Sequence, residues 1–292
     1  MYIDKIKRMI NKYGLIKTII IILKYLVDKI TFPIQLFEAN LYVIYVKFMA
    51  RFNGGYINSP YEVINIPPSL IKYSIHPYPE NYMTFFKTNQ LIDVPKLETI
   101  RRKTLIFNKR VRIVGHVKDG DWDLKKEKYE MLVHDKGFKK RFASKEEWQN
   151  TVYYKFLLEK NKDLLKKNKI EAKNKINNYL QHCDQLFEEI NTNGYKSQSE
   201  QEKTIKSIYN NCFYENKSAN EVEVGISRNG EILFIDGRRR LSIAKLLDLN
   251  SIPVIVNVWH EEYIKKIKYE KNKDKLTPNE AIEPILQQYE NF

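Results

Sequence analysis

The residues best suited to phosphate chemistry stand between a predicted strand and a predicted helix: Asp236, Gly237, Arg238, Arg239 and Arg240. A glycine at such a junction lets the backbone approach a ligand closely, and a helix start offers free N–H groups at the positive end of its dipole. Arginine adds forked donors that match phosphate oxygens. A solvated basic turn is the weaker interpretation, because cations at a helix start oppose the dipole. The segment therefore predicts a phosphate site.

A second group of residues places two carboxylates around a tryptophan, in the order Gly120, Asp121, Trp122 and Asp123. These carboxylates could hold Mg²⁺, or one of them could accept a proton from a substrate hydroxyl during phosphoryl transfer. The structural alternative is a turn with the tryptophan in the core and both carboxylates in solvent. His260 follows an apolar stretch and is either a general base or a surface residue. Asp121, Asp123 and His260 are thus the candidate catalytic residues, and the two aspartates are the candidate metal ligands.

Two further candidates lie in a short connection between predicted helices. Lys196 could neutralise phosphate, and Gln198 could contact a base or a hydroxyl group. The alternative is purely structural, because Gly194 suits the end of one helix and Ser197 suits the start of the next. The structural role is favoured by the residue types, and the ligand-binding role stays open.

The elements that must position these residues follow from hydrophobic periodicity and turn signals. Around the basic segment they are a strand at 221–226, a hairpin turn at Asn229-Gly230, a return strand at 232–235, a helix over about 239–248 and a buried strand at 252–258. Elsewhere they are strand-like segments at 104–107 and 111–114, a helix over about 145–160 after the Ser144–Glu147 capping box, a helix over about 173–191, and helix starts at Ser197 and Thr277.

This pattern resembles the ParB/sulfiredoxin superfamily. The family motif is a strand, Gly-x-[His/Arg]-Arg, a helix with small residues and an Ile-Pro-Val strand. The matching residues here are Gly237, Arg239, Arg240, Ala244 and Ile252-Pro253-Val254. Over about 90–262 the chain also looks like a group of uncharacterised archaeal and bacterial ParB-like proteins, through the ordered segments GHVKDGDWDL, RFASKEEWQNTVYY, INTNGYKSQ and DGRRRLSIAKLL.

The resemblance implies an α+β fold, namely a ParB/sulfiredoxin-like mixed sheet with helices and a helical insertion. It also implies that a nucleotide phosphate is held at the Gly-x-x-Arg helix start, with ATP, ADP or CTP and Mg²⁺ as cofactors. Members of the superfamily hydrolyse CTP, phosphorylate with ATP, act as free-serine kinases or act as nucleases. Sulfiredoxin chemistry is disfavoured, because Arg238 stands at the position of the catalytic cysteine, and Cys183 and Cys212 lie elsewhere.

The charge of the chain calls for an anionic partner. Its 292 residues include 50 Lys and Arg against 36 Asp and Glu, a formal net charge of +14. This balance is typical of proteins that meet nucleic acid, an anionic membrane or phosphate-bearing substrates. An aromatic content of 13% excludes a mostly disordered chain, and two isolated cysteines exclude a disulfide scaffold.

Four segments are expected along the chain. Residues 1–52 form an amphipathic helical region that precedes the fold and whose basic face suits an anionic membrane surface. Packing on the domain or formation of a homodimer would explain the same pattern. Three segments follow: a Pro-rich linker at 53–90, the ParB/sulfiredoxin-like domain at 91–262, and a charged C-terminal tail with a short helix at 263–292.

Together these features predict a cytoplasmic protein, peripheral to a membrane if the N-terminal helices bind lipid. It would bind a nucleotide and transfer phosphate to a hydroxyl-bearing substrate with the help of Mg²⁺. The alternatives are a ParB-like DNA-binding protein or nuclease, and a non-enzymatic membrane-associated nucleotide-binding module. DNA is the less favoured partner, because too few residues follow Trp259 for a helix-turn-helix module.

Overall fold

The computed structural model describes residues 57–60, 62–75, 114–197 and 221–290, the backbone of 101–103 and 110–112, and single positions 15, 19 and 200. The amphipathic region expected at 1–52 lies outside the described residues except for positions 15 and 19. The segment 104–107, Gln198 and Cys212 also lie outside them. Among the described residues, no helix is both long enough and apolar enough to cross a membrane.

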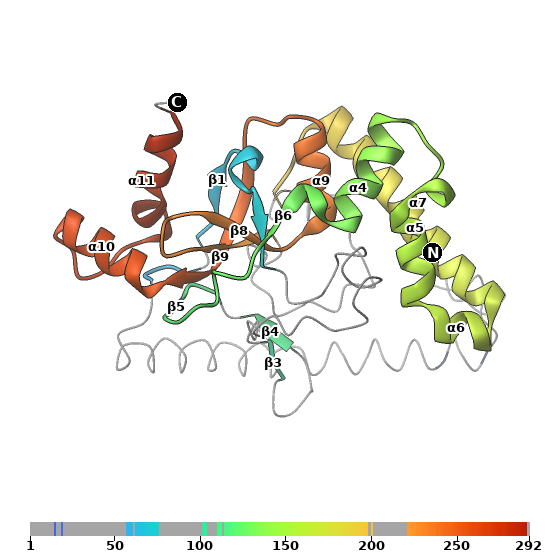
Figure 1. Ribbon diagram of the computed structural model, residues 1–292, viewed down its shortest axis with the longest axis horizontal. Helices are drawn as coiled ribbons and strands as arrows, with labels where there is room; N and C mark the ends of the chain where they lie inside the picture. Colours follow the sequence, from blue (N-terminus) through green and yellow to red (C-terminus); the bar gives the residue numbers. More distant parts are fainter. Residues whose placement is uncertain are drawn as a thin grey trace.

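A seven-stranded mixed sheet forms the centre of the described structure (Figure 1). Its strands are β1 (Ile64–Ile66), β2 (Tyr73–Ser74), β5 (His116–Lys118), β6 (Glu127–Lys128), β7 (Val222–Ile226), β8 (Ile232–Asp236) and β9 (Ile252–His260). The strand order is β1-β9-β7-β8-β2-β6, and β5 also pairs with β9. Strand β9 is parallel to β7 and β5, whereas β7 and β8 form an antiparallel hairpin. Strands β3 (Arg101–Lys103) and β4 (Arg110–Arg112) make a separate antiparallel pair.

Seven α-helices lie in the described part of the chain. They are α4 (Val133–Phe138), α5 (Val152–Lys160), α6 (Lys162–Lys167), α7 (Lys169–Asn193), α9 (Arg238–Leu246), α10 (Glu261–Lys271) and α11 (Pro278–Glu290). Figure 1 shows α5, α6 and α7 to one side of the sheet and α10 and α11 to the other. The prediction of a mixed α+β fold is therefore confirmed.

Two apolar cores meet at α9. The larger core joins β1, β7, β8 and β9 to apolar residues of α9, α10 and α11, such as Leu241, Ile264 and Ile282. The second core joins α4, α5 and α7, and Ile243 of α9 belongs to it. Because Leu241 and Ile243 lie on different sides of the same helix, α9 is packed by both cores, and its start is held in a fixed place.

Several local predictions around the basic segment are confirmed. The hairpin turns at the predicted position, with Gly230 at φ +81° between β7 and β8. Helix α9 and strand β9 occupy their predicted ranges to within a few residues. Helix α11 follows the predicted cap, since the Thr277 N–H donates to Glu280 Oε2 at 2.8 Å. These features depend on residues a few positions apart, so the sequence alone specifies them.

The Pro-rich linker predicted at 53–90 is corrected for residues 62–75. This part supplies two strands to the central sheet: β1 pairs with β9, and β2 pairs with β8 and β6. Prolines lie between these strands, at the start of the 3₁₀ turn Pro68–Leu70. Strands of two and three residues are too short to show an alternating pattern, so the prolines dominated the sequence signal.

The charged tail predicted at 263–292 is also corrected. Helices α10 and α11 and the loop between them bury Tyr263, Ile267, Leu276 and Ala281 in the larger core, so they belong to the folded unit. The apolar residues recur at helical spacing between the charged ones, which gives each helix one buried face.

The helix predicted over 145–160 begins later than expected. Lys145 has a positive φ of +56°, and α5 starts only at Val152, with Thr151 Oγ1 accepting from the Tyr154 N–H at 3.1 Å. Trp148, which precedes the helix, is buried and donates from Nε1 to Asp184 Oδ1 at 2.9 Å. This long-range contact outweighs the Ser144–Glu147 capping signal, which is worth only about 1 kcal/mol.

Candidate functional site

The junction of β8 and α9 brings the backbone close to a neighbouring strand. Gly237 has φ +95° and ψ +25°, and a Cβ atom placed on it would lie 2.9 Å from the Cα of Val222. A side chain is therefore excluded by both conformation and space. Asp236 Oδ1 accepts the Gly237 N–H at 2.7 Å, which fixes the turn into the helix. The glycine in the predicted phosphate motif is thus required by the geometry of the junction.

The three arginines at the start of α9 are partly buried and ordered. Arg240 Nη1 lies 3.0 Å from Oε2 of Glu221, whose side chain is only 1% exposed. The guanidinium of Arg239 lies over the ring of Tyr179 in α7, 5.4 Å from its centroid. The carbonyl oxygen of Arg238 accepts a hydrogen bond from the Tyr129 hydroxyl at 3.2 Å. The guanidinium groups of Arg239 and Arg240 are therefore held by contacts within the protein.

The connection that carries Lys196 lies beside this turn. Burial raises the pKa of Tyr195 to about 12, and the nearby charge of Arg240 opposes that shift. Lys196 itself is exposed. The structural interpretation of the segment is confirmed, because Gly194 ends α7 at φ +73° and Ser197 Oγ donates to Glu200 Oε2 at 2.8 Å.

The only described cysteine lies on α7, close to these arginines. Burial raises the pKa of Cys183 to about 11, although the Arg239 charge lowers it in part. The thiol is therefore protonated at neutral pH, and a protonated thiol is a poor nucleophile.

The Gly120–Asp123 segment forms a tight ion-pair network with a residue of the hairpin turn. Arg228 Nη2 lies 2.9 Å from both Asp123 Oδ1 and Asp121 Oδ1, and it also donates to the Gly120 carbonyl at 2.9 Å. The Arg228 backbone N–H donates to Asp123 Oδ2 at 2.9 Å. Burial raises the pKa of Asp123, but the hydrogen bonds from Arg228 and the nearby His260 outweigh burial and leave it lowered.

This network does not support the predicted metal site. A cation bound by both Asp121 and Asp123 would have to compete with the Arg228 guanidinium, which contacts Oδ1 of each carboxylate. No group of three or more metal-ligating side chains occurs in the described parts of the chain. Trp122 lies in the core, as the structural alternative predicted, but Asp123 is buried rather than solvated.

His260 is a helix cap rather than a general base. Its Nδ1 accepts the Glu262 N–H at 3.2 Å, so Nε2 carries the proton and donates to the Gly120 carbonyl at 2.9 Å. Both ring nitrogens are thus engaged, and the ring is 1% exposed and stacked on Trp122. The catalytic role predicted for His260 is corrected, because no lone pair remains to accept a substrate proton.

The two predicted constellations lie at opposite ends of the sheet. Arg228 precedes β8, whereas Gly237 follows it, and β8 is 5 residues long, which corresponds to about 15 Å. The parallel register of β5 with β9 places Lys118 opposite His260, so the aspartates lie at the end of β9. Asp121 and Asp123 therefore lie at the opposite end of the sheet from Arg240, and the three residues do not form one site.

Sequence reasoning missed the partners of both groups of residues: Arg228, which pairs with the two aspartates, and Glu221, which pairs with Arg240. Arg228 was assigned only to the hairpin turn, and Glu221 only to strand alternation. The available signal was charge in an unusual position: the predicted strand 221–226 carries two glutamates among apolar residues, and a buried glutamate requires a partner. Arg228 carries no such local signal, because its contacts are 105 positions away in the sequence.

Comparison with protein-family models, with curated proteins and with solved structures found no match for this chain. The ParB/sulfiredoxin resemblance therefore rests on the motif residues alone.

Proposed function

We propose that the chain binds a nucleotide through its phosphate groups at the β8–α9 junction. The observation that carries this proposal is the cluster of Arg238, Arg239 and Arg240 in the first turn of a helix whose cap, Gly237, brings the backbone close to β7. Cations destabilise a helix start, so three of them in succession are best explained by an anionic ligand. ATP, ADP and CTP are the ligands that the ParB/sulfiredoxin-like motif suggests.

The proposal is limited to binding at this end of the sheet. The carboxylates expected to serve phosphoryl transfer lie at the other end and are occupied by Arg228. Transfer to a hydroxyl acceptor would need a general base close to α9, and Asp121, Asp123 and His260 do not supply one. Nucleotide binding is therefore the function that the geometry supports best.

The choice of variant decides whether a binding test is informative. Removing Arg240 would leave the buried carboxylate of Glu221 without its ion-pair partner and would unfold part of the site. Arg239 is the better position, because its contact is with the ring of Tyr179 rather than with a buried carboxylate. A double variant, Arg240→Gln with Glu221→Gln, removes both charges and can keep a hydrogen bond between the two side chains.

The experiment is titration calorimetry of the full chain with ATP, ADP and CTP, each with and without Mg²⁺. We expect saturable binding by the wild type and a loss of about tenfold or more in affinity for Arg239→Gln, since a hydrogen bond to a charged group contributes about 1.5–3 kcal/mol. Lys266→Gln, at an exposed position of α10, should bind as the wild type does.

Two results would overturn the proposal. One is a wild-type protein with a native circular dichroism spectrum that binds none of the three nucleotides. The other is an equal loss of affinity in Arg239→Gln and Lys266→Gln, which would show that net charge rather than this site attracts the nucleotide.

A further inference from the structure

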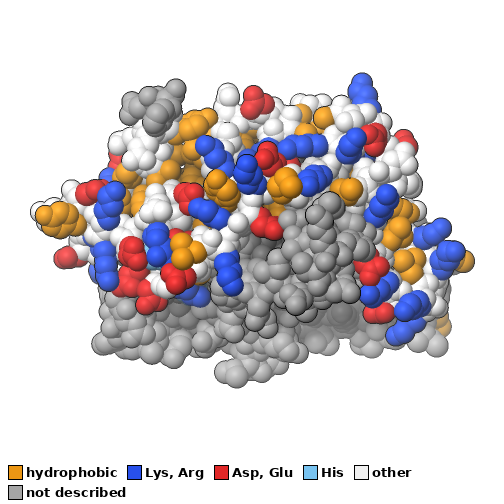
Figure 2. All heavy atoms as spheres, in the orientation of Figure 1, with side chains coloured by type: hydrophobic (Ala, Val, Ile, Leu, Met, Phe, Trp, Pro, Cys, Tyr) orange, Lys and Arg blue, Asp and Glu red, His pale blue; other side chains and the backbone are white. Residues whose placement is uncertain are grey.

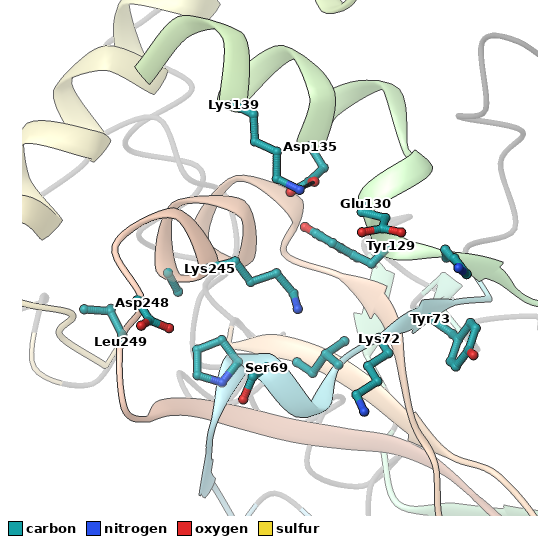
Figure 3. A pocket seen from close by; sticks show the side chains of 14 residues that line it. Ser69, Lys72, Tyr73, Tyr129, Glu130, Asp135, Lys139, Lys245, Asp248 and Leu249 are labelled. Atoms are coloured by element: carbon teal, nitrogen blue, oxygen red, sulfur yellow. Dashed lines mark ion pairs between the residues drawn. The ribbon is translucent and has the colours of Figure 1, made fainter. Parts of the chain in front are cut away.

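A separate cavity of about 470 Å³ lies along the second half of α9. It is bounded by the turn between β1 and β2, by the segment from β6 to α4, and by the end of α9 (Figure 3). Residues 236–240 do not line it. The volume is in the range of sites that hold small molecules.

Lys245 is the central cation of this cavity. Figure 3 shows its side chain directed from α9 into the cavity, with Tyr129 on one side and Ser69 and Lys72 on the other. The Lys245 ammonium lies 5.3 Å from the centroid of the Tyr129 ring. In the described part of the chain, no carboxylate lies within ion-pair distance of this ammonium.

The environment of Lys245 disfavours an unpaired positive charge. Burial lowers its pKa to about 8; the charges of Lys139 and Lys72 act in the same direction, and those of Asp135 and Glu130 act against it. Asp248, which follows α9, is exposed and also lines the cavity. An anion placed beside Lys245 would therefore stabilise its ammonium charge, which burial disfavours.

The wall opposite Lys245 is rigid. The hydroxyl of Tyr129 is bonded to the Arg238 carbonyl at 3.2 Å, to Ser242 Oγ at 3.0 Å and to His134 Nε2 at 3.2 Å. The Tyr129 residue is 2% exposed. A wall fixed by three hydrogen bonds needs no reordering when a ligand enters, which favours binding.

The charges around the cavity are arranged in two groups. Lys139 Nζ is paired with Asp135 Oδ2 at 2.8 Å, and Lys72 and Lys128 are exposed at the rim. The exposed carboxylates of Glu130 and Asp248 also lie at the rim. Figure 2 shows Lys and Arg side chains gathered on this face of the molecule, over α4, α9 and β6. The cavity thus offers one cation, Lys245, at its centre and both signs of charge at its edge.

We propose that this cavity binds a phosphate monoester of a small hydroxylated molecule, with its phosphate on Lys245 and Lys72. Ammonium groups act as compact point charges for phosphate, and a dianion can accept from more than one of them. Hydroxyl groups of the ligand would donate to the carboxylates of Glu130 and Asp248. The proposal does not rest on nucleotide binding at the β8–α9 junction, because the two sites share no residue.

The proposal fixes the direction of a pH effect. A bound phosphate stabilises protonated Lys245, so binding is strongest below pH 8 and weakens as pH rises through that value. If only the ammonium form binds, affinity falls by about tenfold between pH 7 and pH 9, because the protonated fraction falls by that factor.

The test is titration calorimetry of the full chain with ribose 5-phosphate, with inorganic phosphate and with unphosphorylated ribose, at pH 7 and pH 9. The variant is Lys245→Met, which keeps an unbranched apolar side chain, and the matched control is Lys266→Met on α10. Arg239→Gln serves as the control for the other site. Thermal unfolding of each variant verifies that it is folded.

We expect ribose 5-phosphate to bind the wild type, Lys266→Met and Arg239→Gln alike, and to lose at least tenfold in affinity for folded Lys245→Met and at pH 9. Ribose alone should not bind. The proposal is overturned if ribose 5-phosphate does not bind the folded wild type, or if Lys245→Met binds it as the wild type does. A loss in Arg239→Gln equal to that in Lys245→Met would also overturn it, because the ligand would then occupy the β8–α9 junction.

Discussion

The two ends of strand β8 both carry arginine, but they use it differently. At the hairpin end, Arg228 is matched by two carboxylates, Asp121 and Asp123, and by a backbone carbonyl. At the helix end, Arg240 pairs with the buried carboxylate of Glu221, and the Arg239 guanidinium lies over the ring of Tyr179. We call the first arrangement the latch: it holds one arginine between two carboxylates, whereas the second gathers three arginines at a helix start.

This difference shows why residue type alone does not identify a site. Both ends contain a glycine with positive φ, charged side chains and a nearby helix start. An arginine held by several hydrogen bonds within the protein stabilises the fold, whereas several cations gathered at a helix start attract an anion. Four experiments test the contrast.

The largest effect is expected from Asp123→Ala. This change leaves the Arg228 backbone N–H and guanidinium without their buried acceptor, so we expect the free energy of unfolding to fall by about 3 kcal/mol. Asp121→Ala, at a side chain that is 78% exposed, should change it by less than about 0.5 kcal/mol. Urea unfolding followed by circular dichroism measures both, and similar values for the two variants would contradict a buried latch.

The second test compares the loss of stability when a glycine at each end of β8 is changed to alanine. Gly237→Ala combines a positive φ with a close approach to the Val222 backbone, so we expect a loss of at least about 2 kcal/mol. Gly120→Ala has a similar φ, +81°, but nothing within 4 Å of the added Cβ, so only the conformational cost of about 1 kcal/mol applies. The same unfolding assay orders the two, and the reverse order would mean that the junction tolerates a side chain.

The third test compares arginines in terms of stability. Arg239→Gln removes a contact over the Tyr179 ring and should cost no more than about 1 kcal/mol. Arg228→Gln should lower the thermal midpoint much more, because it leaves Asp123 buried without its partner. If Arg239→Gln is the more destabilising of the two, the α9 arginines serve the fold rather than a ligand.

The smallest effect is the pH dependence of the latch. The pKa of Asp123 is lowered below its ordinary value of 3.8 in the folded state, so its contribution is fully present above that value. The contribution is lost as pH falls through the folded pKa, because the carboxylate must then be protonated. The difference in unfolding free energy between wild type and Asp123→Asn should therefore be constant from pH 5 to 7 and shrink below about pH 3. A difference that grows on acidification would contradict this assignment.

Much of the fold around the basic segment was predictable from the sequence. The Asn229-Gly230 turn, the start of α11 at Thr277 and the end of α7 at Gly194 all rest on contacts within a few residues. The predicted start of the helix after Ser144 was wrong because a contact between distant residues decided it. There the buried Trp148 and its bond to Asp184, 36 positions away, decided where the chain turns.

The candidate site was predictable only in part. Gly237, Arg239 and Arg240 were singled out because a strand, a glycine and a basic helix start follow one another directly. The grouping of these residues with Asp121, Asp123 and His260 failed, because nothing in the order of residues says at which end of a sheet two loops meet. Lys245 and its cavity were missed altogether, since the cavity is lined by three segments that are far apart in the sequence.

The sequence by itself determined the turns, the caps, the basic start of α9 and the mixed α+β character, because each depends on local chemistry or on hydrophobic period. Only the tertiary structure decided which carboxylates meet which cations. The parallel register of β5 and β7 with β9 brings Asp123, Arg228 and His260 to one end of the sheet. The pairing of β5 with β9 joins residues more than a hundred positions apart, so local sequence does not show that Asp123 and Arg228 meet in the latch while the arginines of α9 lie at the other end of the sheet.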